Sequence, residues 1–255
     1  MRILAIGDII GESGIKKVKE VLPDLKNKEK IDFVIVNAEN AGDGMGINLS
    51  AYKELKLLPI DIMTMGNHTW SKKDIFGFIE EEKIIRPANY TKNVPGIGYK
   101  LIECKNKKIL VVNLLGRVDM PVLSENPFLV AEKIIEKIDA DIKIVDFHAE
   151  ATAEKMAMGY FLDGKVNLVF GTHTHVQTAD EKILEKGTAY ITDIGMTGPI
   201  KSIIGMEVDI SLKRFLTSLP EKYKTAKGES SLSGIILETS DETNKNIELK
   251  RITIK

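Results

Sequence analysis

Cysteine is nearly absent from this sequence of 255 residues, since Cys104 is the only one. A single thiol excludes a disulfide-stabilised scaffold, a cysteine-based zinc site and an iron–sulfur cluster. Long apolar runs are also missing, and none approaches the roughly 18–20 residues that a membrane helix needs. The opening residues 1–7 are too short and too rich in β-formers for a signal peptide, and no small-residue cleavage site follows them. We therefore expect a soluble, cytoplasmic protein.

The sequence also has no excess of positive or negative charge. The chain has 36 Lys and Arg against 37 Asp and Glu, a net charge of −1. Near-neutrality argues against a protein that clamps long stretches of nucleic acid, so we expect no stable nucleic-acid complex and no membrane partner. The oligomeric state stays open, and a homo-oligomer is compatible with the sequence. With 43% hydrophobic residues and no linker-like segment, residues 1–255 are predicted to form a single domain.

Short apolar runs alternate with charged segments that favour helices. The predicted strands are 3–6, 33–36, 60–65, 109–115, 142–147 and 168–170. The predicted helices are 14–29, 50–58, 71–82, 126–138 and 150–162, with Pro23 expected to break or kink the first. This alternation predicts an α/β fold with a partly parallel sheet that is covered on both faces.

The pattern changes after about residue 180. Residues 183–185 and 188–193 flank Lys186-Gly187 and predict a β-hairpin. Residues 235–238 and 247–254 predict a second antiparallel pair. Residues 195–207 contain three glycines and have no clear period, so we expect a loop there that could serve as a lid.

Residues able to bind a metal follow five of the predicted strands. They include all four histidines of the chain and are Asp8, Glu39, Asn40, Asn67, His68, His148, His173 and His175. The carboxyl ends of parallel strands share one edge of a sheet, where ligands bind. Any one of these residues alone would be explained by a turn, a helix cap or a buried histidine. Five such placements that use every histidine indicate a metal site.

The chemistry of these side chains narrows the metal. Carboxylate and amide oxygens with imidazole nitrogens, and no thiolate, suit Mn, Fe, Co or Zn. The ligands are too many for one catalytic zinc that must keep an open position. They are about right for two metals roughly 3.5–4 Å apart that share a carboxylate, an arrangement suited to displacement at phosphorus.

Other catalytic motifs are missing. The segment Gly7–Gly11 lacks the spacing of a dinucleotide-binding loop, and the chain has neither a phosphate-binding G-x-x-x-x-G-K-[ST] run nor a G-x-S-x-G elbow. Cys104 lies in a predicted hairpin, where we expect a packing role. These absences leave the metal site as the main candidate for chemistry.

Five sequence blocks carry a resemblance to a known family. They are Gly7-Asp-Ile-Ile-Gly11, Asn37-Ala-Glu-Asn-Ala-Gly42, Gly66-Asn-His-Thr-Trp70, Asp146-Phe-His-Ala-Glu-Ala-Thr152 and Gly171-Thr-His-Thr-His-Val-Gln-Thr178. In this order they resemble the YmdB-type subfamily of the calcineurin-like metallophosphoesterases, across nearly the whole chain. The resemblance implies a four-layer αββα sandwich with mixed sheets, and a dinuclear centre often occupied by iron or manganese. It also implies phosphodiesterase activity, with 2′,3′-cyclic nucleotides as the substrate of the subfamily.

The resemblance also distributes the ligands between the two metals. The general superfamily has a histidine where this chain has Ile10, which cannot bind a metal, and we infer that Asn40 takes that role. The first metal would then be held by Asp8, Glu39, Asn40 and His175. The second would be held by Glu39, Asn67, His148 and His173. In this scheme Glu39 bridges the two.

His68 has no metal in this scheme. Attack by a hydroxide that bridges the metals would expel a sugar alkoxide, which needs a proton, and an imidazole with a pKa near 6.5 suits that task. We therefore expect His68 to be the proton donor. Candidate walls of the substrate pocket are residues 41–49, 117–127 and 195–207, with Arg117, Lys201 and Ser202 as weak candidates for phosphate or sugar contacts.

Two other functions remain compatible with the same residues. One is a phosphomonoesterase that acts on nucleotides or phosphoproteins with the same metals. The other is a regulatory binding protein that retains the metal site for stability or docking. The presence of His68, which has no metal to hold, favours catalysis over the binding protein.

Overall fold

Two β-sheets that pack face to face form the centre of the protein. The structure is a computed structural model that describes residues 1–255. The first sheet contains, in spatial order, β2 (Asp8–Ile9), β12 (Met196–Pro199), β13 (Ser230–Thr239), β1 (Arg2–Ile6), β3 (Phe33–Asn37), β4 (Ile62–Thr64) and β5 (Ile84–Ile85), and β14 (Asn246–Ile254) also pairs with β13. The second sheet contains β10 (Lys182–Ile183), β11 (Ala189–Ile191), β9 (Leu168–Thr172), β8 (Ile142–His148), β7 (Lys107–Leu115) and β6 (Tyr99–Cys104).

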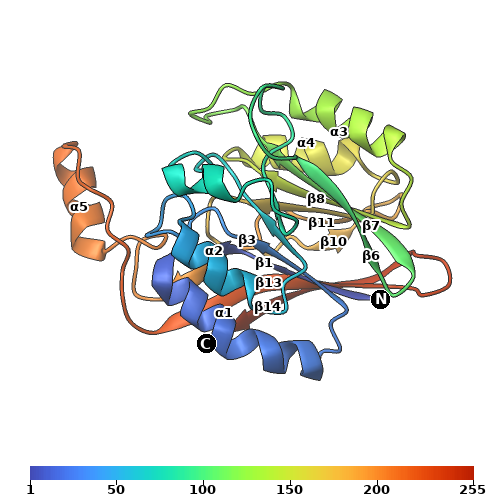
Figure 1. Cartoon of the computed structure of the whole chain (residues 1–255), viewed down its shortest axis with the longest axis horizontal. Helices are drawn as coiled ribbons and strands as arrows, with labels where there is room; N and C mark the ends of the chain where they lie inside the picture. Colours follow the sequence, from blue (N-terminus) through green and yellow to red (C-terminus); the bar gives the residue numbers. More distant parts are fainter.

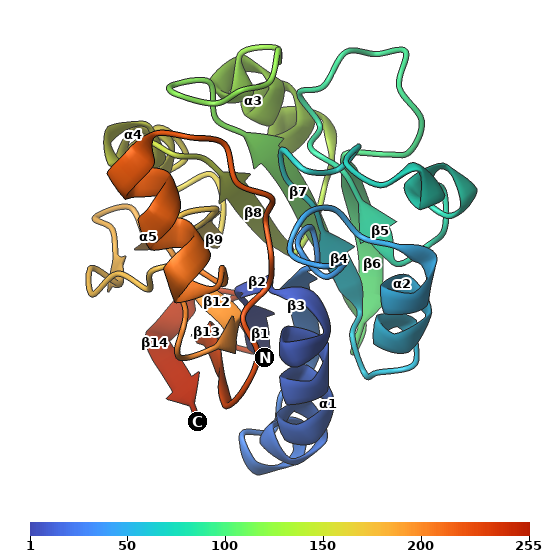
Figure 2. The same ribbon diagram turned by 90° about the vertical axis from the view of Figure 1, so that its left-hand side faces the viewer.

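Four of the five α-helices cover the outer faces of the two sheets, and the fifth projects from the body (Figure 1). In chain order the five are α1 (Gly11–Lys28), α2 (Leu49–Lys56), α3 (Pro127–Lys137), α4 (Thr152–Phe161) and α5 (Val208–Thr217), with a short 3-10 helix at Lys73–Gly77. Figure 1 shows α1 along the lower side of the first sheet, α2 beside it, α3 and α4 above the second sheet, and α5 standing away from the body. Figure 2 shows α1 and α3 again on opposite sides of the sheets. The result is the four-layer αββα arrangement that the resemblance implied.

The alternation of side chains along the strands explains these layers. In β1, Leu4 and Ile6 lie in a core cluster with α1 and α2, whereas Ile3 and Ala5 lie in a second cluster between the two sheets. In β7, likewise, Val111 faces the other sheet and its neighbours face α3 and α4. Successive side chains of a strand point to opposite faces, so apolar strands of this kind fill two cores each.

Parallel strands bring the reactive segments to one end of the molecule. In the first sheet β1 pairs in parallel with β3, and β3 with β4. In the second sheet β8 pairs in parallel with both β7 and β9. The prediction of a single sheet edge was therefore incomplete, because the strand ends that carry these residues belong to two sheets, which meet at the same side of the sandwich.

Most elements of the sequence analysis are confirmed, with shifts of a few residues at their ends. Both antiparallel pairs are present, as β10 with β11 and β13 with β14. The strands and helices that build the four layers therefore lie close to their predicted positions.

Four details of the structure differ from the sequence analysis. Of the predicted break or kink at Pro23, the break is absent, because α1 continues to Lys28. The predicted helix 71–82 is only the 3-10 helix Lys73–Gly77, because Gly77 disfavours a longer helix. This short helix is enough to bury the side chain of Ile75. Residues 195–207 are not only a loop, since they contain β12, which pairs with β2 and β13. The helix α5 was not predicted.

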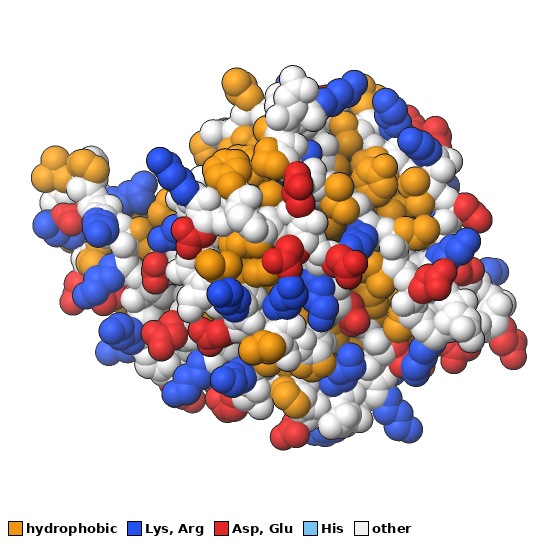
Figure 3. All heavy atoms as spheres, viewed as in Figure 1, with side chains coloured by type: hydrophobic (Ala, Val, Ile, Leu, Met, Phe, Trp, Pro, Cys, Tyr) orange, Lys and Arg blue, Asp and Glu red, His pale blue; other side chains and the backbone are white.

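The helix α5 packs little against the body of the protein. Its only buried residue is Ser211, whereas the side chains of Phe215 and Leu216 are 76% and 83% exposed. Figure 3 shows hydrophobic side chains at the outer end of this projection. None of the helices in the structure is both long and apolar enough to span a bilayer.

Candidate metal centre

The structure brings all eight predicted site residues together at the junction of the two sheets. In the first sheet, Asp8 is the first residue of β2, Glu39 and Asn40 follow β3, and Asn67 and His68 follow β4. In the second sheet, His148 is the last residue of β8, and His173 and His175 follow β9. The side chains other than that of His68 form two groups, one around His148 and one around Asp8.

The group around His148 is the more compact. The Nε2 atom of His148 lies 2.9 Å from Asn67 Oδ1, 3.1 Å from Glu39 Oε1 and 3.1 Å from His173 Nδ1. One ring nitrogen can make only one good hydrogen bond, yet three candidate ligand atoms surround it. Potential ligand atoms of Glu39, His148 and His173 all lie within 4.8 Å of one another. A cation among these atoms would satisfy all of them.

The second group contains Asp8, Asn40 and His175. The Nε2 atom of His175 lies 3.7 Å from Asp8 Oδ1 and 3.3 Å from Asn40 Nδ2. Both Asp8 Oδ1 and Asn40 Oδ1 are buried without a hydrogen-bond partner. Buried oxygens without partners are costly, so their presence in the cluster is the second sign that it accommodates a cation. A flip of the Asn40 amide would exchange its nitrogen for an oxygen at this position.

Glu39 lies between the two groups. Its Oε1 atom is 3.1 Å from His148 Nε2 and accepts a hydrogen bond of 3.1 Å from Asn40 Nδ2. Its Oε2 atom accepts a hydrogen bond of 3.1 Å from the backbone N–H of His68. The His68 ring itself makes no hydrogen bond to the cluster and has only a contact of 3.4 Å between Nδ1 and Ser71 Oγ.

The protonation states of the cluster follow from its charges. Burial alone would lower the pKa of His175, but the carboxylate of Asp8 raises it to about 9. Burial would likewise raise the pKa of Asp8, but His175 holds that pKa well below its usual range. Burial and the nearby charge of His148 lower the pKa of His173 to about 3, so this ring is neutral. Without a metal, protons on imidazoles thus balance the buried carboxylates.

The donor atoms fit transition metals. They are carboxylate and amide oxygens with imidazole nitrogens, the set that suits Mn, Fe, Co and Zn. The backbone of Gly66 also approaches closely, because an added Cβ would lie 2.3 Å from Glu39 Oε2 and 2.4 Å from His148 Nε2. Any other residue at position 66 would therefore push into the ligand atoms.

Each of the three imidazoles has a partner on the nitrogen that faces away from the cluster. His148 Nδ1 contacts Thr172 Oγ1 at 2.9 Å, and this hydroxyl donates a hydrogen bond of 2.7 Å to the buried carboxylate of Asp146. His175 Nδ1 donates a hydrogen bond of 2.9 Å to the carbonyl of Ile204. His173 Nε2 lies 3.0 Å from Glu150 Oε2. Such partners fix the tautomer and orientation of a metal-binding ring.

The sequence analysis missed these partners. Asp146 and Glu150 each stand two positions from His148 in an extended segment, and this spacing was the one signal that could have suggested them. The carbonyl of Ile204 had no signal, because it comes from a segment with no period.

A buried ion pair holds the turn that carries His173 and His175. Lys155 Nζ lies 2.8 Å from Asp193 Oδ2, and both side chains are at most 1% exposed. The same Oδ2 accepts hydrogen bonds from the backbone N–H and the hydroxyl of Thr174, at 3.1 Å and 2.7 Å. His173 and His175 have φ angles of +99° and +66°, a region that side chains other than glycine rarely adopt. The ion pair therefore stabilises an unfavourable turn between the two histidines.

The three predicted pocket walls take different positions. In 195–207, Ile204 reaches the cluster through its carbonyl, whereas Ser202 Oγ is used within its own turn, donating to Pro199 O at 2.7 Å. In 117–127, the backbone N–H of Arg117 is bound by Glu154, and its side chain is exposed. Lys201 is exposed as well. No polar contact links Arg117, Lys201 or Ser202 to the cluster, and their role in binding stays a prediction.

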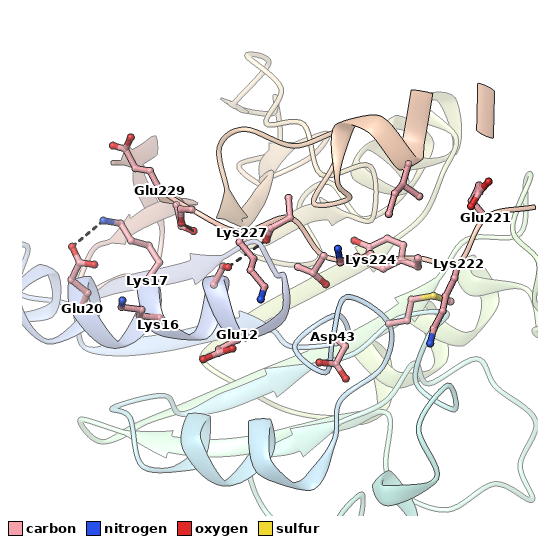
Figure 4. A pocket seen from close by; sticks show the side chains of 18 of the residues that line it. Glu12, Lys16, Lys17, Glu20, Asp43, Glu221, Lys222, Lys224, Lys227 and Glu229 are labelled. Carbon is pink, nitrogen blue, oxygen red and sulfur yellow. Dashed lines mark hydrogen bonds and ion pairs between the residues drawn. The ribbon is translucent and has the colours of Figure 1, made fainter. Parts of the chain in front are cut away.

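A large hollow of the surface lies outside the cluster. It has a volume of about 1400 Å³ and runs between α1, residues 221–230, Asp43 and Lys72. Figure 4 shows lysines and carboxylates side by side along its wall. Seven lysines and five carboxylates line it, so their opposite charges largely cancel. The hollow does not single out an anionic or a cationic ligand.

The sandwich of two mixed sheets and the cluster of oxygen and imidazole ligands at their junction together define a metallophosphoesterase. The chain matches the family described as YmdB-like protein over residues 4–252. It belongs to this family, as its sequence blocks indicated.

Individual relatives cover the whole chain. It is 47% identical over 257 residues to a 2′,3′-cyclic-nucleotide 2′-phosphodiesterase of Bacillus subtilis (strain 168), and the match covers 100% of this chain and 97% of that protein. The crystal structure of a novel phosphatase from Mycoplasma pneumoniae has 40% identity and a TM-score of 0.95, and the match covers 100% of this chain and 93% of that one. The crystal structure of a hypothetical protein from Thermus thermophilus has 38% identity and the same TM-score, with coverage of 99% and 98%. The chain is a hydrolytic, metal-binding enzyme of this family.

Proposed function

We propose that this chain is a phosphodiesterase with two transition-metal ions, iron or manganese first among them, and that it hydrolyses small phosphodiesters such as 2′,3′-cyclic nucleotides. The position of Glu39 carries this proposal. Its Oε1 atom is 3.1 Å from a ligand atom of the His148 group and 3.1 Å from the side chain of Asn40, which belongs to the other group. A carboxylate in this position suits a bridge between two ions. The name of the Bacillus subtilis relative supports the choice of substrate.

The two groups of residues support a division of the ligands between the two metal ions. Asp8, Asn40 and His175 would hold the first ion, and Asn67, His148 and His173 would hold the second, with Glu39 on both. This division agrees with the contacts, because His175 lies against Asp8 and Asn40 whereas His173 lies against His148. When bound, the ions would activate water as a nucleophile and offset negative charge on the phosphate.

His68 would supply the proton that the leaving group needs. Water forms a new bond to phosphorus and releases a proton to solvent, while the bond from phosphorus to O2′ breaks and O2′ takes up the proton of His68. The 2′-oxygen leaves as an alcohol, so the product is a 3′-phosphate. The backbone of His68 is tied to Glu39 Oε2, which keeps the residue beside the cluster, while its ring is free of hydrogen bonds to the ligands. Imidazole is the side-chain group best suited in general to donating a proton at neutral pH.

The phosphomonoesterase alternative is favoured by one observation, the description of the Mycoplasma pneumoniae structure as a phosphatase. Both reactions use the same metals, so the alternatives differ in the ester that is cleaved. One set of assays separates them.

The test starts with metal content by elemental analysis of the purified protein. Hydrolysis is then measured with added Mn²⁺ on 2′,3′- and 3′,5′-cyclic nucleotides, on bis-p-nitrophenyl phosphate and on a phosphomonoester. About two transition-metal ions per chain and selective cleavage of 2′,3′-cyclic nucleotides are expected. Preference for the monoester would establish the alternative, and no hydrolysis by fully loaded protein would refute both.

The variant His68→Ala tests the proton donor. Its turnover should fall by about 10²–10⁴-fold, because a positioned acid contributes that much, while the metal content stays near that of the wild type. Protein treated with EDTA provides the inactive control. Loss of metal from His68→Ala would instead make His68 a ligand.

A further inference from the structure

Among the histidines of the cluster, His173 alone has a carboxylate on its outer nitrogen. The Nδ1 atom faces the cluster, 3.1 Å from His148 Nε2, and the Nε2 atom lies 3.0 Å from Glu150 Oε2 on the other side. The corresponding partners of the two other imidazoles are neutral, a threonine hydroxyl for His148 and a backbone carbonyl for His175. The His173 ring is therefore set apart by a charged partner.

We propose that Glu150 is a positioning residue that holds the ring of His173 as a metal ligand. The inference rests on the proposed function, because it takes the cluster to be a site for two metal ions. A carboxylate beside Nε2 favours the tautomer with the proton on that atom, which leaves the lone pair on Nδ1, the atom that faces the cluster. Its negative charge also makes the ring a stronger donor to a metal.

The backbone around His173 explains why the ring needs this partner. The φ angle of His173 is +99°, and its backbone N–H donates to Asp8 Oδ2 at 3.3 Å. The next residue, Thr174, is bound by the buried carboxylate of Asp193. The main chain is thus held from two sides, and the ring itself lies between His148 and Glu150, so loss of the Glu150 contact removes the restraint on its outer edge.

Glu150 itself contributes little to the packing of the protein. Its side chain is 49% exposed, and it lies in the short connection between β8 and α4. Substitution at this position should therefore change the centre without unfolding the chain. The Asp193 side chain, by contrast, is buried and could not be replaced so safely.

The experiment measures the affinity of metal-free full-length protein for Co²⁺ by calorimetric titration, together with the visible absorption spectrum of bound Co²⁺. The variants are Glu150→Ala and Glu150→Gln. The control is Glu185→Gln, which removes one exposed carboxylate from the turn between β10 and β11. In Glu150→Ala, the affinity for one of the two ions should fall by about 10–100-fold and the spectrum of that ion should change, while the other ion binds as before. Glu150→Gln, whose amide oxygen can still accept a hydrogen bond from the Nε2–H group, should show a smaller loss, and the control should match the wild type.

Three results would count against Glu150. Wild-type affinities for both ions in Glu150→Ala would exclude the role, and so would equal losses at both ions, because Glu150 contacts only His173 among the ligands. A loss in Glu185→Gln as large as in Glu150→Ala would make the effect one of overall charge. The metal-free Glu150→Ala protein could have a lower unfolding temperature than the metal-free wild type. In that case the Co²⁺ affinities of Glu150→Gln test the proposal in place of those of Glu150→Ala. Wild-type protein that does not bind two ions would instead refute the proposed function.

Discussion

At the scale of single residues, Glu39 is unusual in being fully buried with both carboxylate oxygens engaged. One oxygen contacts the His148 group and Asn40, and the other accepts the N–H of His68. Burial would raise the pKa of this carboxyl, but the charge of His148 lowers it. The side chain is therefore ionised, which is the state that a ligand shared by two cations requires.

The variant Glu39→Gln should weaken the binding of both metal ions at once, since the neutral amide removes one negative charge from each site. Elemental analysis after dialysis against a weak chelator would measure this, with Glu185→Gln as the control for charge. Retention of the normal metal content with full activity would remove Glu39 from the bridging position.

Sequence reasoning was most successful at this scale. It identified all eight clustered side chains, because each follows an apolar strand and lies within a sequence block of the family. It could not find the pairing of Lys155 with Asp193, since a charged residue in the middle of a predicted helix is normally exposed to solvent. Only the packing of α4 against β9 buries that lysine.

At the scale of elements, the turn between β9 and residue 180 depends on its buried ion pair. Replacement of Lys155 by methionine keeps the volume but leaves the charge of Asp193 buried without its partner. We expect Lys155→Met to lower the free energy of unfolding by about 3–5 kcal/mol, measured by urea denaturation.

A matched control for this variant is Lys165→Met. Lys165 pairs with Glu132 across 3.0 Å, but its side chain is 41% exposed. Exposed pairs contribute little, so the loss should stay under about 1 kcal/mol. A similarly small loss in Lys155→Met would show that the buried pair does not stabilise the turn.

The same segment gives the protein a dependence on pH. Although burial would raise the pKa of Asp180, hydrogen bonds from Thr178 and Thr192 lower it. A carboxyl with a lowered pKa in the folded state stabilises that state above its unfolded pKa, near 3.9, and loses this contribution as the pH falls.

Asp180→Asn should therefore reduce the unfolding temperature most at neutral pH. The difference from the wild type should shrink as the pH falls from about 6.5 to about 3. Thermal unfolding of metal-free protein measures this without interference from metal release. A difference that stays constant or grows in acid would contradict the assignment.

The elements themselves could be predicted where they have a regular apolar pattern. The strands of both sheets, such as β3 and β8, are nearly continuous apolar runs, and α3 has an apolar face at helical spacing. The strand β12 could not be predicted, because Met196–Pro199 contains both a glycine and a proline and is held by two strands distant in the sequence. Long-range pairing of this kind leaves no local pattern.

At the scale of the whole molecule, α5 is separate from the three cores. The substitution Leu216→Ser should change the free energy of unfolding by no more than about 0.5 kcal/mol, because an exposed side chain loses no packing. Leu162→Ala is the matched control, since Leu162 is fully buried and its truncation should cost about 2–5 kcal/mol.

Both variants should be measured at several protein concentrations by urea denaturation. A cost for Leu216→Ser that approaches that of Leu162→Ala and grows with concentration would show that α5 packs against another copy of the chain. That result would place the interface of the predicted homo-oligomer at α5.

The pairing of β1 with β13 has a consequence for how the protein matures on the ribosome. The two strands are antiparallel neighbours inside the first sheet, although the strands of the second sheet lie between them in the sequence. Until residues 230–239 have left the exit tunnel, β1 has one unpaired edge. The segment that leads from β1 to Asp8 then lacks its neighbouring strand. A translation product truncated before residue 230 should therefore be inactive, even though it contains every proposed metal ligand.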